Sequence, residues 1–464
     1  MRVTVCVRQG LDGEINPFDA AAYEVALRIP DAEVTLLSMG PLGVRDFLLR
    51  LTRLGARRAV LLSDAAFAGA DTLATAYALS MALKKIPTDL LLCGRQTLVG
   101  DTGQTGPMLS VLAELAPITE VMEILSCTPQ AVCCRTRTEQ TLTAPLPALL
   151  TVERVANLRL PSIRSRVGEV EVWSAADITA DPARCGLAGS PTRVVETREN
   201  QSGRRRCRRI TPAELPAVIA ESLARQRQER SEKNAVNSSL HILTVGEAPL
   251  PYAHSVSANV SVLSLVDEEM LLEQIRSADA DAVLFGSDAA SKLMAARVAA
   301  RLGLGLCADC TALSAEGDEL LMIRPALAGS LVAKIKSRTR PAMATVRTTG
   351  SSEAALLVAA GLGARNALPV VEALAKRFSG TLAATRRMVD EGFMPYELQV
   401  GLTGRTVAPA VYLAVGVSGA VHHIVGMQRS GTVIAVNPDP KAPIFDYADF
   451  GIVATAEELA ALLS

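Results

Sequence analysis

Short apolar runs separated by polar loops recur along this chain. In its N-terminal part, five such runs alternate with segments whose apolar positions have helical spacing, and they occupy residues 3–7, 34–38, 59–62, 89–93 and 148–152. Continuous apolar runs of this length are typical of strands buried on both faces of a parallel sheet. Alternation with helical segments such as residues 71–85 implies right-handed crossovers. The pattern therefore predicts an α/β fold with a mainly parallel sheet.

The same pattern returns near the C-terminus. Residues 411–415 and 432–436 are apolar runs bounded by Gly, Ser, Asn and Pro. Buried parallel strands carry ligand-binding loops at their carboxyl ends, and a helix that begins there points free N–H groups at an anion. The loop after the first run contains two glycines, a serine and two of the chain's four histidines: Gly416, Ser418, Gly419, His422 and His423. We expect a nucleotide crevice here.

The sequence also contains two similar six-residue segments, which we call the echo segments. Residues 281–286, D-A-V-L-F-G, are similar to residues 89–94, D-L-L-L-C-G, which suggests two related α/β units. Between these units lie a basic run at residues 204–209 and a charged, helix-favouring run at residues 214–233. Because no aromatic residues accompany the arginines, a solvated arm and linker is favoured over a nucleic-acid site.

Composition narrows the class of protein. The chain has 464 residues, which fits about three domains. Hydrophobic residues make up 49% and aromatic residues only 3%, so the core must be aliphatic; the formal net charge of -1 argues against a partner such as nucleic acid. The sequence has no apolar run of about 18 residues and no signal-like N-terminal segment. We expect a soluble, cytoplasmic protein that does not insert directly into a membrane.

Nine cysteines are present, and Cys6 and Cys93 fall inside predicted strands, where buried reduced thiols are common. Cys307 and Cys310 form C-A-D-C, a spacing found in redox pairs and zinc sites. A second C-x-x-C and suitably spaced histidines are missing, so ordinary core thiols are the favoured interpretation.

A candidate phosphate-binding turn lies at residues 101–106, D-T-G-Q-T-G, at a predicted strand-to-helix junction. A glycine-rich turn with hydroxyl groups presents several N–H and O–H donors to an anion. The alternative is a plain helix cap at Thr102.

Four motifs stand in order in the C-terminal region: T-G-R-T-V-A-P at residues 403–409, S-G-A-V-H-H at 418–423, N-P-D-P-K-A-P-I-F at 437–445 and A-D-F-G-I-V at 448–453. Together they resemble the FAD-binding domain of the large (alpha) subunit of electron-transfer flavoproteins. Four ordered motifs within one domain make a highly specific match.

The N-terminal half resembles the small (beta) subunit of the same family. The matching segments include V-C-V-R-Q at residues 5–9, I-N-P-F-D at 15–19, S-M-G-P at 38–41, L-C-G-R-Q at 92–96 and G-D-T-G-Q-T-G-P at 100–107. The resemblance implies one chain that fuses both subunits. It would contain two related nucleotide-binding-type α/β units and a C-terminal Rossmann-like (DHS-like) FAD-binding domain.

The resemblance also implies domain boundaries. We expect a small-subunit-like domain at residues 1–227, a linker at 228–239, a shortened large-subunit α/β domain at 240–349 and the FAD-binding domain at 350–464. Residues 211–227 are similar to the arm with which the small subunit embraces the large one.

By resemblance, FAD binds in the C-terminal domain, with His423 near flavin O2 and Thr403 near N5. Hydrogen bonds at these atoms suit a flavin that passes single electrons. The other implied FAD contacts are Thr385, Arg386, Gln399, Val400, Gly404, Gly416, Ser418, Gly419, Ala420, His422, Asn437, Asp439 and Asp449. From the residues alone, His423 could instead cap a helix and Thr403 could close a turn.

The family's small subunit holds a second nucleotide, which is AMP in ordinary members and a second FAD in electron-bifurcating ones. The positions implied for this nucleotide are Cys6, Val7, Asn16, Asp64, Asp101, Thr102, Gly103, Gln104 and Thr105. Which of the two nucleotides binds stays open.

Three positions near the implied flavin depart from the family. Leu362, between Gly361 and Gly363, stands where the family has an arginine, and Leu402 and His422 replace common glutamines. Loss of the arginine should weaken the stabilisation of an anionic flavin and lower its potential, unless Arg365 or His422 substitutes.

The resemblance implies an electron carrier between a flavoprotein dehydrogenase, such as an acyl-CoA dehydrogenase, and an acceptor such as a quinone oxidoreductase or a ferredoxin. Ile163 stands at the family's docking anchor, although the usual lysine cluster beside it is absent. Two alternatives are an NADH-oxidising, electron-bifurcating flavoprotein with two FADs, and a nucleotide-sensing regulatory protein without redox activity.

Overall fold

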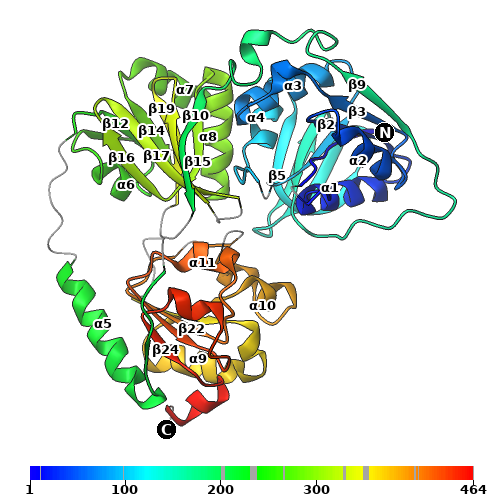
Figure 1. Cartoon of the computed structure of the whole chain (residues 1–464). Helices are drawn as coiled ribbons and strands as arrows, with labels where there is room; N and C mark the ends of the chain where they lie inside the picture. Colours follow the sequence, from blue (N-terminus) through cyan, green and yellow to red (C-terminus); the bar gives the residue numbers. More distant parts are fainter. Residues whose placement is uncertain are drawn as a thin grey trace. The chain divides into compact units, whose positions relative to one another are not determined.

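The structure is a computed structural model, and it describes the chain except residues 11, 98, 200–203, 230–237, 265–266, 328–330, 348–354, 402–403, 406 and 463–464. The chain folds into two compact units (Figure 1). Unit 1 falls within residues 1–197, 237–327 and 333–346, and unit 2 falls within residues 198–236, 328–332 and 347–464. Most of the expected linker at 228–239 and the boundary expected at 349–350 lie outside the described residues.

The first lobe of unit 1, residues 1–191, is built on a nine-stranded sheet with the order β7-β6-β5-β8-β4-β1-β2-β3-β9. Five of its strands match the predicted runs and pair in parallel, namely β1 (Arg2–Cys6), β2 (Glu33–Met39), β3 (Arg58–Leu62), β4 (Leu90–Gly94) and β8 (Ala148–Val152). The other strands are β5 (Ala116–Cys127), β6 (Ala131–Thr136), β7 (Thr141–Pro145) and β9 (Glu169–Trp173). The antiparallel edge β5-β6-β7 was not predicted.

Helices cover both faces of this sheet. They are α1 (Pro17–Arg28), α2 (Val44–Thr52), α3 (Thr72–Leu83) and α4 (Thr105–Leu112). Successive strand residues point to opposite faces. Leu36 accordingly packs in the cluster that contains residues of α1 and α2, whereas Leu37 packs in the cluster that contains residues of α3 and α4. Asp71 begins α3, because its carboxylate accepts hydrogen bonds from the amides of Leu73 and Ala74.

The second lobe of unit 1, residues 192–197, 238–327 and 333–346, contains a five-stranded parallel sheet with the order β13-β12-β14-β19-β15. Its strands are β12 (Ile242–Val245), β13 (Val260–Leu263), β14 (Ala282–Phe285), β15 (Leu306–Cys310) and β19 (Ala342–Val346). A smaller sheet has the order β10-β18-β17-β16, with β10 (Thr192–Glu199), β16 (Ala312–Glu316), β17 (Glu319–Ala326) and β18 (Leu331–Ser337). The helices are α6 (Leu250–His254), α7 (Glu268–Ser277) and α8 (Ala289–Leu302).

The two lobes of unit 1 place corresponding strands in the same way in their parallel sheets, as the two similar sequence segments predicted. The two echo segments form β4 and β14, and each strand lies beside the first strand of its parallel sheet. Asp89 precedes β4 and accepts a hydrogen bond from the amide of Arg2 at 2.8 Å, while Asp281 precedes β14 and accepts one from the amide of His241 at 2.7 Å. In both lobes, therefore, an Asp carboxylate just before the second strand of the pair accepts a hydrogen bond from an amide at or just before the start of the first strand.

A shared core joins the two lobes within unit 1. Helix α4 of the first lobe packs against α8 of the second, and Leu109 and Ala295 lie in one cluster of buried residues. Arg297 of α8 also donates a hydrogen bond to the hydroxyl of Ser110 at 3.4 Å. Cys307 and Cys310 of β15 are buried free thiols.

Unit 2 contains a parallel sheet with the order β11-β24-β23-β22-β20-β21. Its strands are β11 (Arg208–Arg209), β20 (Leu356–Ala360), β21 (Thr381–Ala384), β22 (Val411–Val415), β23 (Thr432–Val436) and β24 (Phe450–Ile452). Its helices are α5 (Leu215–Glu229), α9 (Leu368–Arg377), α10 (Arg386–Asp390) and α11 (Val421–Met427). Strands β22 and β23 are the two runs predicted from the sequence.

The arm packs into unit 2. Leu215, Val218 and Ile219 of α5 lie in the same buried cluster as Leu413 of β22. The expectation of a solvated basic run is wrong for Arg205, which forms an ion pair with Asp449 and donates hydrogen bonds to three main-chain carbonyls, those of Gln428, Ser430 and Gly431. The sequence pattern could not show that these carbonyls lie beside the arm.

Candidate nucleotide-binding sites

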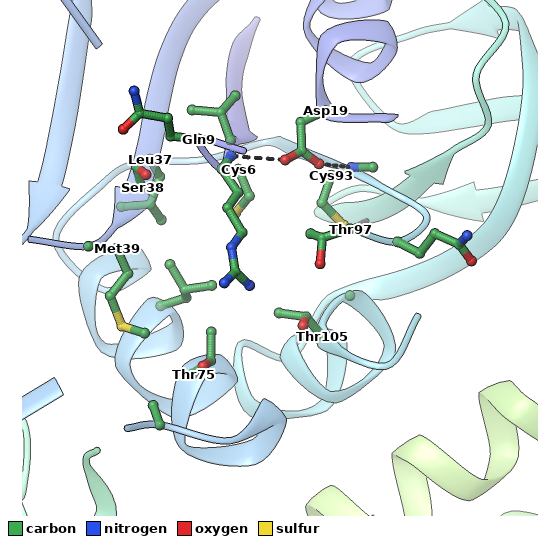
Figure 2. Close-up of a pocket in the computed structure, with 18 of the residues that line it drawn as sticks. Cys6, Gln9, Asp19, Leu37, Ser38, Met39, Thr75, Cys93, Thr97 and Thr105 are labelled. Carbon is green, nitrogen blue, oxygen red and sulfur yellow. Dashed lines mark hydrogen bonds between the residues drawn. The ribbon is translucent and has the colours of Figure 1, made fainter. Parts of the chain in front are cut away.

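A pocket of about 480 Å³ opens in the first lobe where the strand order reverses (Figure 2). From β1 the chain proceeds to β2 and β3 on one side and then returns to β4 on the other. Ligands of open α/β sheets bind at the carboxyl ends of strands at such a switch point. Cys6 ends β1, its neighbour Cys93 lies near the end of β4, and both line the pocket.

Asp19 lies at one side of this pocket with the two thiols, while Thr75 and Thr105 approach from the opposite side in Figure 2. Its carboxylate accepts hydrogen bonds from the amides of Arg8 at 2.9 Å and Gly94 at 3.2 Å. Burial nevertheless raises the pKa of Asp19 to about 7 and the pKa of Cys6 to about 12, and it raises the pKa of Cys93 well above its ordinary value. The thiols are therefore protonated and act as apolar walls rather than as nucleophiles.

The candidate phosphate turn forms the other side of the pocket. Asp101 and Gly103 both have positive φ angles, 51° and 65°, so the backbone turns sharply on either side of Thr102. Within the described part of the chain, the main-chain N–H groups of Thr102 and Gly103 have no acceptor. Free amides in a turn of this kind are donors for a phosphate oxygen.

The structure brings together five of the nine positions expected at the second nucleotide. The lining includes Cys6, Val7, Thr102, Gly103 and Thr105. Asp101 and Gln104 belong to the turn without lining the pocket, and Asn16 donates a hydrogen bond to the carbonyl of Gln96 at 2.9 Å. Asp64 does not line the pocket either, and its carboxylate accepts hydrogen bonds from the amides of Ala66 and Ala175. The nucleotide roles of all nine stay predictions.

Several polar residues of the pocket lining were missed by the sequence analysis, among them Arg8 and Gln96. Arg8 lines the pocket, and its side chain has no ion-pair partner among the described residues. Gln96 lines it as well and is 7% exposed, and its side-chain Nε2 has no hydrogen-bond partner in the part of the chain that the structure describes. Arg8 lies inside the quoted motif V-C-V-R-Q, and Gln96 lies inside the quoted motif L-C-G-R-Q. The two motifs are therefore the sequence signal that could have identified these residues. A cation and an unpaired amide suit the polar groups of a nucleotide.

Unit 2 has a switch point of its own between β20 and β22. The chain leaves β20 for β21 at one edge and returns to β22 on the other side. The loops that follow these two strands touch, because the amides of Gly361 and Gly363 donate hydrogen bonds to the carbonyls of Val415 and Gly416. Gly416 has a φ of 65°, and a Cβ there would overlap the backbone of the opposite loop. The glycines thus let the two loops pack directly against each other at the switch point.

His423 is 6% exposed and lies at the start of α11, as predicted for a helix that follows the glycine loop. Its Nε2 lies 2.9 Å from the hydroxyl of Tyr412, and its Nδ1 lies 3.1 Å from the carbonyl of Val400. Both ring nitrogens thus have partners inside the protein. The expected donation to flavin O2 stays a prediction, and it requires Nε2 to gain a proton as well as to exchange Tyr412 for the flavin.

Other expected FAD contacts lie around the same loops. Ser418, Ala420 and His422 are exposed, and burial followed by the charge of Arg386 lowers the pKa of His422. The side chain of Asn437 donates to the carbonyl of Val417 at 2.9 Å, which ties the loop after β23 to the loop after β22.

The remaining expected contacts are less directly placed. Thr385 caps α10, Gln399, Val400 and Gly404 precede β22, Asp439 follows Asn437 in a turn, and Asp449 pairs with Arg205. Thr403, expected near flavin N5, and Leu402 lie outside the described residues. Leu362 begins the short 3-10 helix Leu362–Ala367, on which Arg365 is exposed. Ile163, the expected docking anchor, is fully exposed in the loop before β9.

Family models match most of this architecture. Residues 3–178 and 252–376 match the electron transfer flavoprotein domain, and residues 351–428 match the electron transfer flavoprotein FAD-binding domain. The chain belongs to the electron transfer flavoprotein family. The FAD-binding match includes Gly361, Gly416 and His423, so the matched segment contains the switch point between β20 and β22.

Relatives of both subunits occur among electron transfer flavoproteins of one organism, Thermoanaerobacterium thermosaccharolyticum. Its subunit alpha is 31% identical over 271 residues, which cover 48% of this chain and 80% of the subunit. Its subunit beta is 38% identical over 202 residues, which cover 41% of this chain and 78% of the subunit. The prediction that both kinds of subunit are joined in one chain is confirmed.

A third relative is the LctC subunit of a lactate dehydrogenase (NAD(+),ferredoxin) from Acetobacterium woodii. It is 34% identical over 235 residues, which cover 41% of this chain and 56% of LctC.

In the part of this electron transfer flavoprotein that the structure describes, no helix has the length and apolar character needed to cross a membrane.

Proposed function

We propose that this chain is an electron carrier that binds FAD in the crevice between β20 and β22. It would take electrons from a flavoprotein dehydrogenase, such as an acyl-CoA dehydrogenase, and deliver them to an acceptor such as a quinone oxidoreductase or a ferredoxin. One observation carries the proposal: the match to the FAD-binding domain falls on the switch point whose loops are lined by Gly361 and Gly416. Dinucleotides bind at such crevices.

The residues of the crevice fit a flavin dinucleotide. FAD, when bound, supplies reversible transfer of one or two electrons. Gly416 and Gly419 let this loop pack against neighbouring main chain, and the exposed hydroxyl of Ser418 between them is available as a donor to the dinucleotide. The buried pair of Tyr412 and His423 fixes the helix that follows this loop.

The pocket of the first lobe is proposed to hold AMP or a second FAD. Its volume of about 480 Å³ lies within the range of small-molecule sites, and the free amides of Thr102 and Gly103 together with Arg8 suit a phosphate. Gly103→Val should expel the nucleotide, because a branched side chain is strained at a φ of 65°, while FAD in unit 2 stays bound. Loss of neither nucleotide would show that the turn is only structural.

Electron transfer is tested by anaerobic reduction and reoxidation. The purified chain is reconstituted with FAD, reduced by a flavoprotein dehydrogenase with its substrate, and mixed with an artificial one-electron acceptor. We expect the flavin absorbance to bleach and then return, with one acceptor molecule reduced for each electron stored. A flavin that stays bound but is never reduced would favour the nucleotide-sensing alternative.

A second candidate function is NADH-dependent electron bifurcation. It is supported by the likeness to LctC, whose printed name pairs NAD(+) with ferredoxin, and by a pocket large enough for part of a dinucleotide. Two FADs per chain and rapid bleaching by NADH would favour this function. One FAD and one AMP per chain, with no reaction with NADH, would favour the simple carrier.

A further inference from the structure

Arg324, on β17 of the second lobe, contacts the phosphate turn of the first lobe. It is 5% exposed, and its Nη2 donates hydrogen bonds to the carbonyl of Gly100 at 2.9 Å and to the carbonyl of Asp101 at 2.8 Å. Just beyond β17, the amide of Leu327 donates to the carbonyl of Val99 at 3.3 Å. Three consecutive carbonyls of the first lobe are thus bonded by the second lobe.

These bonds determine the direction of the next amide. In a trans peptide the carbonyl and the following N–H point in opposite directions. The carbonyl of Asp101 points toward Arg324, so the N–H of Thr102 points away from Arg324. Thr102 lines the pocket whereas Arg324 does not, and this N–H has no acceptor among the described residues.

The backbone on either side of Thr102 needs support from outside the turn. Asp101 has a φ of 51°, a left-handed conformation that is unfavourable for a residue with a side chain. Its amide donates to the carbonyl of Thr97 at 2.8 Å, which closes one end of the turn. The two hydrogen bonds from Arg324 hold the carbonyls of Gly100 and Asp101. A planar guanidinium can reach both carbonyls at once.

We propose that Arg324 is a positioning residue for nucleotide phosphate in the first-lobe pocket. It orients the Thr102 amide without touching the nucleotide, so the pocket is competent only when the second lobe is docked on the first. Nucleotide binding should in turn stabilise that docking, because coupling between two equilibria is reciprocal. The inference rests on the proposed nucleotide function of the pocket.

A general role in joining the lobes is the competing explanation, and Arg338 provides the matched control. Arg338 also lies in the second lobe and donates to a first-lobe carbonyl, that of Leu187, at 3.2 Å. Neither Arg338 nor Leu187 lines the pocket. Arg338→Gln therefore removes an exposed side-chain contact between the lobes and leaves the phosphate turn supported.

The test uses the full chain carrying FAD and measures AMP binding by calorimetry for the wild type, Arg324→Gln, Arg324→Lys and Arg338→Gln. Arg324→Gln should bind AMP about 10- to 100-fold more weakly, the loss expected when charge-assisted hydrogen bonds that orient a site are removed. Arg324→Lys should lie between it and the wild type, because an ammonium still donates to a carbonyl. Arg338→Gln should bind like the wild type.

Hydrogen exchange supplies a second measurement that does not depend on AMP. The segment 97–106 should exchange faster in Arg324→Gln than in Arg338→Gln, while the FAD content of unit 2 is equal in both. Equal AMP affinity in Arg324→Gln and the wild type, or an equal loss in Arg338→Gln, would overturn the inference. If Arg324→Gln did not fold, Arg324→Lys with wild-type exchange and wild-type affinity would overturn it. A wild-type chain whose pocket binds neither AMP nor a second FAD at any concentration would refute the pocket's proposed function and this inference with it.

Discussion

Tyr412 donates its hydroxyl hydrogen to Nε2 of His423, whose Nδ1 donates to the carbonyl of Val400. The directions follow because a carbonyl can only accept, so Nδ1 carries the hydrogen and Nε2 is left with a lone pair. Burial lowers the pKa of His423 to about 4 and raises the pKa of Tyr412 well above its ordinary value. At neutral pH the imidazole is therefore uncharged. It is held in one tautomer between the hydroxyl of Tyr412 on β22 and the carbonyl of Val400.

The first prediction is a pH dependence of stability in unit 2. The folded pKa of His423 lies near 4 and the unfolded value near 6.5, so between these values the unfolded ring binds a proton that the folded ring does not. Stability should therefore fall as the pH drops from about 6.5 to about 4, by up to about 1.4 kcal/mol per pH unit from this group. Hydrogen exchange of residues 411–427 measures it.

Matched variants separate this histidine from other titrating groups. His423→Gln should lose this part of the pH dependence, whereas His422→Gln should keep the contribution of His423. Tyr412→Phe should destabilise the unit by about 1 kcal/mol, since one buried hydrogen bond is lost. An identical pH profile in the wild type and His423→Gln would refute the assignment.

The second prediction concerns the glycine loop after β22. Gly419 has a φ of 93°, and a Cβ there would overlap the backbone of Ile444, whereas Gly392 has a φ of 77° and open space around its Cβ position. Gly392→Ala should cost only the strain of the left-handed backbone, roughly 1–2 kcal/mol. Gly419→Ala should cost clearly more and should reduce FAD binding. Urea unfolding and FAD titration of both variants measure these effects, and equal losses in the two would contradict the account.

The third prediction tests the contact of Arg205, in the basic run that precedes the arm, with the rest of unit 2. Arg205→Ala removes an ion pair with Asp449 and hydrogen bonds to the carbonyls of Gly431 and Ser430. We expect a loss of about 1–3 kcal/mol in the free energy of unfolding of unit 2, because these acceptors lose a charged donor. Arg206, which is exposed, is the matched control and should change stability by no more than about 0.5 kcal/mol. A wild-type stability for Arg205→Ala would show that this contact is dispensable.

Patterns of apolar residues predicted much of the sheet architecture. The runs at 411–415 and 432–436 are strands with the same bounds in the structure, and Asp71 begins a helix as its sequence position indicated. These elements are buried on both faces, so burial alone determines their pattern. Strands β6 and β7 were missed because they lie at an antiparallel edge, where only alternate residues of β6 are buried and Leu142 of β7 is exposed.

The candidate sites were predicted in part. The glycine loops were visible in the sequence because their residue types are demanded by local backbone geometry. The contacts of Arg205 and Arg324 were not visible, because each side chain reaches main-chain carbonyls more than two hundred positions away, and a carbonyl is present at every residue. The internal partners of His423 were hidden for the same reason, since Val400 contributes only its backbone.

Cofactor content after reconstitution is the most direct test of the central claim that unit 2 is a flavin-binding electron carrier. The purified chain is incubated with FAD, separated from free cofactor, and denatured so that released FAD can be counted per chain. We predict at least one FAD per chain in the wild type, one retained in Gly103→Val, and a sharply reduced content in Gly419→Ala. A wild-type chain that contains no FAD and takes up none on reconstitution would contradict the account.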